Sequence, residues 1–305
     1  MLDEDTARAL LTVADECRAR LTFLGDQHQL AAVGRGGVLD LAAARVDPAA
    51  HLILDGVHRF TRTLMDPDGS MRTVPDASYA DLTLAMRTGE DPGKVFDALC
   101  ARGQIRIHPD APALNASLAA TVAVEFDAGQ RPAVAVDTRE QAAELNAAIR
   151  ERLVTERRVD DLAAVTTRSG QRIGAGDRVA TRRNDRALGV ANRDTWTVVS
   201  VDATGQLVVT PADTTPATGT PAARPGSRGR SPSVAPRPEQ HRVLPADYVA
   251  GHVELAYVTT VHGVQGDTVP SAHLVVGERT GAASAYVGMT RGRQNNTARL
   301  IAADL

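Results

Sequence analysis

The sequence is almost without lysine. Of its 34 Lys and Arg residues, only Lys94 is a Lys, a preference for Arg that is typical of coding bias. A phosphate-binding P-loop, G-x-x-x-x-G-K-[ST], needs a Lys that contacts the β- and γ-phosphates and a hydroxyl that binds Mg²⁺. Lys94 ends the run Gly89-Glu90-Asp91-Pro92-Gly93-Lys94, which is one residue short between the glycines and is followed by Val95. The sequence therefore contains no P-loop.

Aromatic residues, cysteines and long apolar runs are also scarce. Aromatics make up 3% of the 305 residues, so aliphatic side chains must build the core, as in α/β layers. Cys17 and Cys100 are too few for a disulfide framework or a Cys-based zinc site, and we expect two buried thiols. No run approaches the about 18 apolar residues of a membrane helix, there is no signal segment, and the His spacing indicates no metal site. These absences favour a cytoplasmic protein without membrane contact.

The length predicts about two domains. The formal net charge of −3 excludes a uniformly basic nucleic-acid-binding protein but leaves room for a local basic groove.

Apolar runs that end at polar residues predict an α/β domain. We expect strands at 21–24, 52–54 and 133–136, because buried parallel strands are apolar throughout and bind ligands at their carboxyl ends. Helices are expected over 3–20 and from Thr138, a candidate N-cap, to about Val154. After residue 245 the α/β pattern returns, with strands at 256–260, 273–276 and 299–302 and a helix over 282–291.

The pattern changes between residues 166 and 245. Segments 176–180, 195–201 and 206–209 alternate with period two, which predicts a small β module. Residues 211–245 contain eight of the 16 prolines and are expected to be a disordered loop, either passive or a partner-binding or DNA-contacting tail. Trp196 is expected in the core of the module, the alternative being that it stacks on a base.

Four stretches carry more polar chemistry than folding requires. Each stretch alone could have a purely structural role, as a turn, as a solvated face, or as a helix end at which an arginine compensates the helix dipole. They are Gly25-Asp26-Gln27-His28-Gln29-Leu30, His58-Arg59-Phe60, Thr259-Thr260-Val261-His262-Gly263-Val264-Gln265-Gly266 and Tyr286-Val287-Gly288-Met289-Thr290-Arg291-Gly292-Arg293.

In this order and spacing, the four resemble motifs III, IV, V and VI of superfamily 1 DNA helicases of the RecD-like group. They are similar in particular to the helicase part of conjugative relaxases of the TraI/TrwC type. The resemblance covers nearly the whole chain, and motifs V and VI are its most specific parts. It implies a RecA-like parallel sheet, the second motor domain, with an inserted SH3-like β-barrel.

The resemblance also implies residue roles. Gln29, Arg59 and Arg291 would be catalytic: Gln29 at the γ-phosphate or its water, and the two arginines as fingers that reach ATP. The implied ATP-binding set is Gly25, Asp26, Gln29, Arg59, Gln265, Gly266 and Arg291. The implied DNA-binding set is Thr259, Thr260 and His262, together with Arg182, Arg183 and Arg186 of the barrel, which otherwise form a solvated barrel edge.

The P-loop and the D-E motif of a complete helicase are missing, and Met1-Leu2-Asp3 resembles the residues just after the D-E motif. We therefore expect residues 1–45 to be a remnant of the first RecA-like domain with motif III. Residues 46–165 and 246–305 would form the second domain, with 166–245 inserted. The chain would bind single-stranded DNA, and it would bind ATP and Mg²⁺ only together with a P-loop-bearing partner domain. The alternatives are a non-catalytic DNA-binding module and an inactive fragment.

Overall fold

The computed structural model describes residues 2–31, 37–54, 56–89, 91–212 and 241–302. The chain divides into two compact units. Unit 1 comprises the residues up to Leu114, Arg131–Arg139 and those from Thr259 onward, and unit 2 comprises Asn115–Gln130 and Glu140–Val258. The domain limits expected from the sequence remain a prediction. Met1 and residues 213–240 of the expected loop lie outside the described residues.

Unit 1 is built on a five-stranded parallel sheet with the strand order β12-β4-β13-β14-β3. Every neighbouring pair in it is parallel, and Leu274 pairs with both Ala135 and Ala298 at its centre. The expected α/β class with a parallel sheet is confirmed. The strands are β3 (Ile105–His108), β4 (Ala133–Val136), β12 (Thr259–Thr260), β13 (Val269–Val275) and β14 (Gly292–Ile301).

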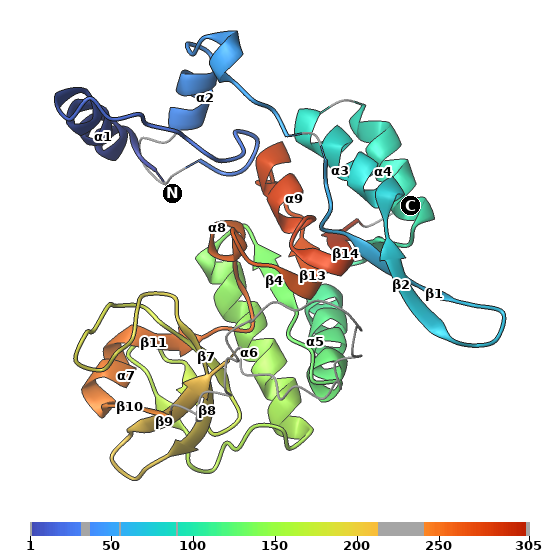
Figure 1. Ribbon diagram of the computed structural model, residues 1–305. Coiled ribbons are helices and arrows are strands. Elements are labelled where there is room, and N and C mark those ends of the chain that lie inside the picture. Colours follow the sequence, from blue (N-terminus) through green and yellow to red (C-terminus); the bar gives the residue numbers. More distant parts are fainter. Residues whose placement is uncertain (1, 32–36, 55, 90, 213–240, 303–305) are drawn as a thin grey trace, which may run out of the picture. The chain divides into compact units, whose positions relative to one another are not determined.

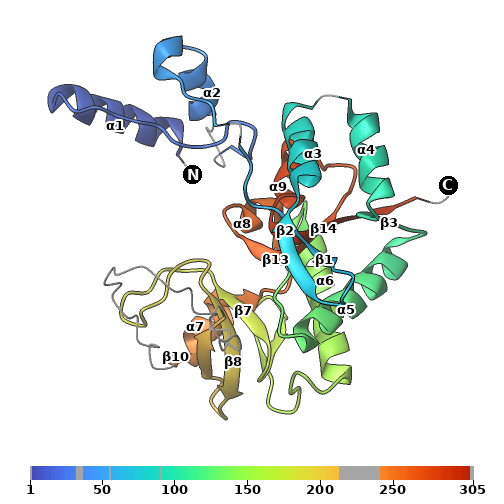
Figure 2. The same cartoon turned by 45° about the vertical axis from the view of Figure 1, so that its right-hand side comes forward.

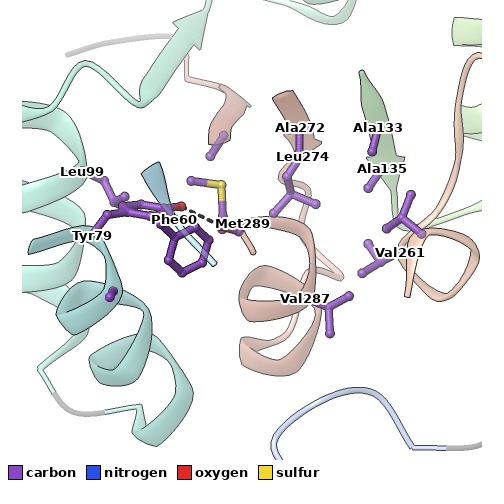
Figure 3. Close-up of a cluster of buried hydrophobic side chains, with 13 residues drawn as sticks. Phe60, Tyr79, Leu99, Ala133, Ala135, Val261, Ala272, Leu274, Val287 and Met289 are labelled. Atoms are coloured by element: carbon purple, nitrogen blue, oxygen red, sulfur yellow. Dashed lines mark hydrogen bonds between the residues drawn. The ribbon is translucent and has the colours of Figure 1, made fainter. Parts of the chain in front are cut away.

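Helices α3 and α9 lie side by side in Figures 1 and 2 and share the core of unit 1 with the sheet. Figure 3 shows Phe60, Tyr79 and Leu99 on one side of Met289, and the apolar residues of β13 and β4 on its other side. The Phe60 and Tyr79 rings meet edge to face, with 4.8 Å between their centroids. The remaining elements of this unit are α1 (Glu4–Glu16), α2 (Val38–Ala43), a short 3-10 helix (Pro48–Ala50), β1 (Thr61–Met65), β2 (Met71–Pro75), α3 (Ala77–Thr88), α4 (Pro92–Ala101), α8 (Val261–Val264) and α9 (Ala282–Gly288).

The start of α3 is fixed by Asp76. Its carboxylate accepts a hydrogen bond from the Tyr79 backbone N–H at 3.1 Å and pairs with Arg102 at 2.5 Å. These donors hold the pKa of Asp76 below its ordinary value, although burial alone would raise it. The capped helix therefore carries Tyr79 into the core and Arg87 to its far end.

Unit 2 holds the predicted β module. Its five-stranded antiparallel sheet has the order β10-β9-β8-β7-β11, and Trp196 is buried in its core at 5% exposure, as expected. The elements are α5 (Ala111–Asp127), α6 (Arg139–Thr155), β5 (Val165–Thr166), β6 (Arg172–Ile173), β7 (Arg178–Thr181), β8 (Thr195–Val201), β9 (Leu207–Pro211), β10 (Arg242–Leu244), α7 (Ala246–His252) and β11 (Val253–Leu255). The first turn of α5 and the first residue of α6, Arg139, belong to unit 1.

A buried polar network joins α6 to this sheet. The Asp177 carboxylate, fully buried, accepts hydrogen bonds from Arg150 Nε at 2.8 Å, the Tyr257 hydroxyl at 2.6 Å and the Gly174 N–H at 2.7 Å. Asn146 accepts from the N–H groups of Tyr257 and Val258 through its side-chain oxygen. Every bond named here is internal to unit 2, so α6 is an integral part of it.

Several sequence-based expectations were wrong. Residues 21–24 and 52–54 are not strands, and Leu24 and Leu52 are 91% and 82% exposed. An apolar run becomes a strand only where a neighbouring strand supplies hydrogen bonds, and none does so in the described part of the chain. Cys17 and Cys100 are exposed rather than buried.

Other elements are shifted. The described ends of the expected loop at 211–245 are ordered, since Pro211 ends β9 and Arg242–Leu244 forms β10. The segment 256–260 is a strand only at Thr259–Thr260, and the helix at 282 ends at Gly288. No helix among the described residues has the length and apolar character needed to cross a membrane.

Candidate functional site

Two arginines from distant parts of the chain meet at Thr290, directly after α9. Arg59 Nη1 donates to the Thr290 carbonyl at 2.7 Å, and Arg291 Nη2 donates to the Thr290 hydroxyl at 2.8 Å. The core places them, because Phe60 follows Arg59 and the Tyr79 hydroxyl donates to the Met289 carbonyl at 2.6 Å. Two successive carbonyls after α9 are thus held by side chains from the segment 59–79.

Arg291 is 2% exposed, and its guanidinium is bonded to neutral groups. Its Nε donates to the Val287 carbonyl at 2.8 Å and its Nη1 lies 3.5 Å from the Asp267 carbonyl. Burial and the nearby charge of Arg59 lower the pKa of Arg291 to about 10. No carboxylate of the described residues lies within ion-pair distance of either arginine, so the pair carries an excess of positive charge.

The backbone after Arg291 is fixed by Asn296. Its side-chain oxygen accepts from the Gly292 N–H at 2.8 Å, and its side-chain nitrogen donates to the Gly292 carbonyl at 2.9 Å. A Cβ at Gly292 would lie 2.0 Å from the Asn295 carbonyl oxygen, so no other residue fits there without movement. This closed loop fixes the backbone directly after Arg291, where β14 begins.

The residues of the first motif form a turn next to α9. The Asp26 carboxylate accepts from the Tyr286 hydroxyl at 2.9 Å and from the Gln29 side-chain amide at 3.3 Å. Arg87 Nε lies 3.3 Å from the same carboxylate, at ion-pair distance but without hydrogen-bond alignment. Burial, followed by the charge of Asp26, raises the pKa of Tyr286 to about 12.

Gln265 ties the third motif to the first. Its side-chain nitrogen donates to the Leu30 carbonyl at 3.1 Å. Its side-chain oxygen is buried without a partner among the described residues, and a flip of the amide would exchange the two atoms. Gly266, at a φ of +100°, turns the chain away directly afterwards. Gly25 lies in the loop before the turn, and a Cβ there would meet the Leu39 side chain at 2.5 Å.

The three residues of the DNA-binding set in unit 1 lie together at the end of β12 and in α8. Thr259, Thr260 and His262 are half-buried. A Cβ on Gly263 would lie 2.1 Å from the Thr259 hydroxyl oxygen, so the glycine permits the close turn that brings them together.

The three arginines of the DNA-binding set in unit 2 are all exposed, but they are not equally available. Arg182 pairs with Glu254, and Arg183 Nη1 lies 3.4 Å from His252 Nε2. Arg186 has no ion pair among the described residues. The paired carboxylate lowers the positive charge of this edge below what the sequence indicates.

Three residues that shape the site lie outside the four motifs or have no role in them: Arg87, Tyr79 and Asn296. Arg87 lies in the ordinary helical sequence of α3, and its contact with Asp26, 61 positions away, leaves no local signal. Tyr286 lies in the stretch that resembles motif VI, but the resemblance implies no role for it. Within the described ranges, no group of three or more His, Cys, Asp or Glu residues is placed to hold a metal ion.

Tyr79→Phe tests how firmly the core holds the backbone at Met289. We expect it to lower the free energy of unfolding by about 1–2 kcal/mol, because the buried Met289 carbonyl loses its donor. Chemical denaturation followed by circular dichroism measures this. Tyr248→Phe removes a similar bond to the carbonyl of the exposed Arg183 and should cost less. Equal costs for the two variants would contradict the assigned role of Tyr79.

Comparisons with known proteins give limited matches. Residues 1–110 match a family model described as an AAA domain. Uncharacterised proteins of two strains of Mycobacterium tuberculosis, CDC 1551 / Oshkosh and ATCC 25618 / H37Rv, are each 46% identical over 54 residues, 18% of this chain and 31% of theirs. The match thus spans less than a third of these curated relatives.

Among solved structures, the similar chains include Pif1 helicases. Bacteroides Pif1 bound to ssDNA has a TM-score of 0.44 at 14% identity, over 75% of this chain and 50% of that one. Pif1 helicase from Candida albicans has a TM-score of 0.42 at 13% identity, over 74% of this chain and 53% of that one. The chain therefore covers about half the length of these helicases.

Proposed function

We propose that this chain is the second-motor-domain part of a superfamily 1 helicase-type DNA translocase, in particular that of a conjugative relaxase. The observation that carries the proposal is the meeting of Arg59 and Arg291 at Thr290, without a carboxylate at ion-pair distance. The match of residues 1–110 to an AAA domain model supports it.

The chemistry of such a pair suits phosphoryl transfer. Negative charge builds up on the γ-phosphoryl oxygens in the transition state, and planar guanidiniums that remain charged stabilise it. Burial and the charge of Arg59 lower the pKa of Arg291, so a polyphosphate bound nearby would favour its charged form. Arg59, which is half-buried, would be the more accessible of the two, and Gln29 would orient the attacking water.

ATP and Mg²⁺ would be held mainly by a P-loop-bearing domain that these 305 residues do not contain. In this proposal, Thr259, Thr260 and His262 contact the backbone of single-stranded DNA. The β module of unit 2 is SH3-like and adds Arg183 and Arg186 as phosphate contacts, whereas the charge of Arg182 is offset by Glu254.

The test is an ATPase assay of the chain with and without a purified P-loop-bearing first motor domain of a TraI/TrwC-type relaxase. We expect no hydrolysis above background by the chain alone. In the mixture we expect hydrolysis that single-stranded DNA stimulates. Hydrolysis by the chain alone would contradict the proposal. Salt-dependent DNA binding without any ATPase activity in the mixture would favour a non-catalytic DNA-binding module.

A further inference from the structure

The Asp26 carboxylate lies in the turn of the first motif and contacts side chains of α3 and α9. It contacts Arg87 of α3 at 3.3 Å and the Tyr286 hydroxyl of α9 at 2.9 Å. The Arg87 and Asp26 side chains are only 21% and 18% exposed, so solvent screens the pair weakly. This contact connects the turn at residues 25–30 to two helices of unit 1.

The arginines outnumber the carboxylates around this contact. Arg59 lies close enough to Arg291 to lower its pKa, and Asp26 and Asp267 lie close enough to oppose that effect. Arg87 and Arg291 likewise both act on the pKa of Tyr286. Three guanidiniums, those of Arg59, Arg87 and Arg291, and two carboxylates, those of Asp26 and Asp267, therefore act on one another here, and Asp26 is the carboxylate at ion-pair distance from Arg87.

A carboxylate in such a place can occupy the position of a phosphate group. It accepts from guanidinium and hydroxyl donors as a phosphate oxygen does, but it brings one negative charge where a polyphosphate brings several. It would also repel a phosphate that approached the same donors.

We propose that Asp26 is an internal counter-ion that occupies part of a polyphosphate site, and that Arg87 is a third phosphate-binding residue of that site. An incoming polyphosphate takes the place of Asp26 at Arg87. This inference rests on the proposed function for the identity of the nucleotide, but the exchange itself needs only a polyphosphate.

The exchange would also release Gln29. In the present structure the Gln29 amide is bonded to the Asp26 carboxylate, and the Gln29 N–H lies 3.2 Å from the Asp26 carbonyl. Moving the carboxylate frees the amide to hold a water molecule. Site occupancy and the availability of Gln29 would therefore be linked through Asp26.

The experiment is isothermal titration of the complete chain with inorganic tripolyphosphate at low ionic strength. We expect Asp26→Asn to bind about tenfold more tightly than the wild type, because the competing charge is gone while the shape is kept. We expect Arg87→Gln to bind several-fold more weakly. Tyr286→Phe, which removes one of the donors to Asp26 without a change of charge, should bind slightly more tightly.

Two exposed residues of unit 1 provide matched controls. Asp81→Asn lies on the same helix as Arg87, and Arg106→Gln lies on β3, so each makes the same charge change away from the site. Thermal unfolding of each variant confirms that it is folded. An affinity of Asp26→Asn equal to that of Asp81→Asn, or of Arg87→Gln equal to that of Arg106→Gln, would overturn the proposal. Since no P-loop domain is present, this failure is separate from a failure of the ATPase test.

Discussion

Arg291→Ala is expected to lower the DNA-stimulated ATPase rate of the mixture with a P-loop domain by about 10³–10⁵-fold, the range for loss of an arginine finger. The reason is electrostatic: the guanidinium is buried beside a second arginine, Arg59, and a phosphoryl group that gains negative charge in the transition state would stabilise its charge. Steady-state assays at saturating ATP measure the effect. Arg293→Ala is the matched control, because Arg293 is exposed and lies only two positions away.

The size of this effect should not come from unfolding. The lowered pKa of Arg291 means that the folded chain holds this proton less tightly than the unfolded chain does, so the charge costs stability at neutral pH. Stability from this group is present at high pH and falls as the pH drops through about 10. Arg291→Ala relieves this cost but removes the buried hydrogen bonds to the Val287 carbonyl and the Thr290 hydroxyl, so thermal unfolding has to show that the variant is folded at the assay temperature. An active Arg291→Ala mixture would exclude Arg291 as a finger.

The second large effect is expected in unit 2. Asp177→Ala should lower the free energy of unfolding of this unit by about 3–5 kcal/mol, because the buried Arg150 would keep only the more exposed Asp161, at 2.8 Å, as its partner. The Tyr257 hydroxyl and the Gly174 N–H would lose their acceptor as well. Urea denaturation followed by the fluorescence of Trp196, the only Trp, reports on this unit.

An exposed pair in the same unit supplies the comparison. Arg172 pairs with Asp161 at 2.9 Å, but their side chains are 51% and 37% exposed. Arg172→Ala should cost at most about 1 kcal/mol. If Asp177→Ala costs no more than Arg172→Ala, the buried network does not stabilise unit 2 in the way we describe.

The sequence predicted well those elements whose signal is local. The alternation at 195–201 and the apolar run at 133–136 became β8 and β4 with the expected limits. The runs at 21–24 and 52–54 are also mainly apolar but lack neighbouring strands in the described part of the chain. The hairpin of β1 and β2 had a readable signal, the turn Asp66-Pro67-Asp68-Gly69, which was overlooked.

The candidate site was predictable only in part. The motifs named Arg59 and Arg291, and the structure brings both to Thr290. Arg87 could not be found from the sequence, because its partner Asp26 is distant along the chain and an arginine at the end of a helix is commonplace. The isolation of Arg291 from carboxylates is likewise a property of three-dimensional packing.

The bonds between α6 and the sheet of unit 2 limit how this β module can be transplanted. A fragment of unit 2 that starts at Val165, where β5 begins, would carry away Asp177 and Tyr257 but leave Arg150 and Asn146 behind. A host protein that accepted such a graft would have to replace these donors and acceptors from its own surface. The module can therefore be exchanged between proteins only together with the helix that precedes it.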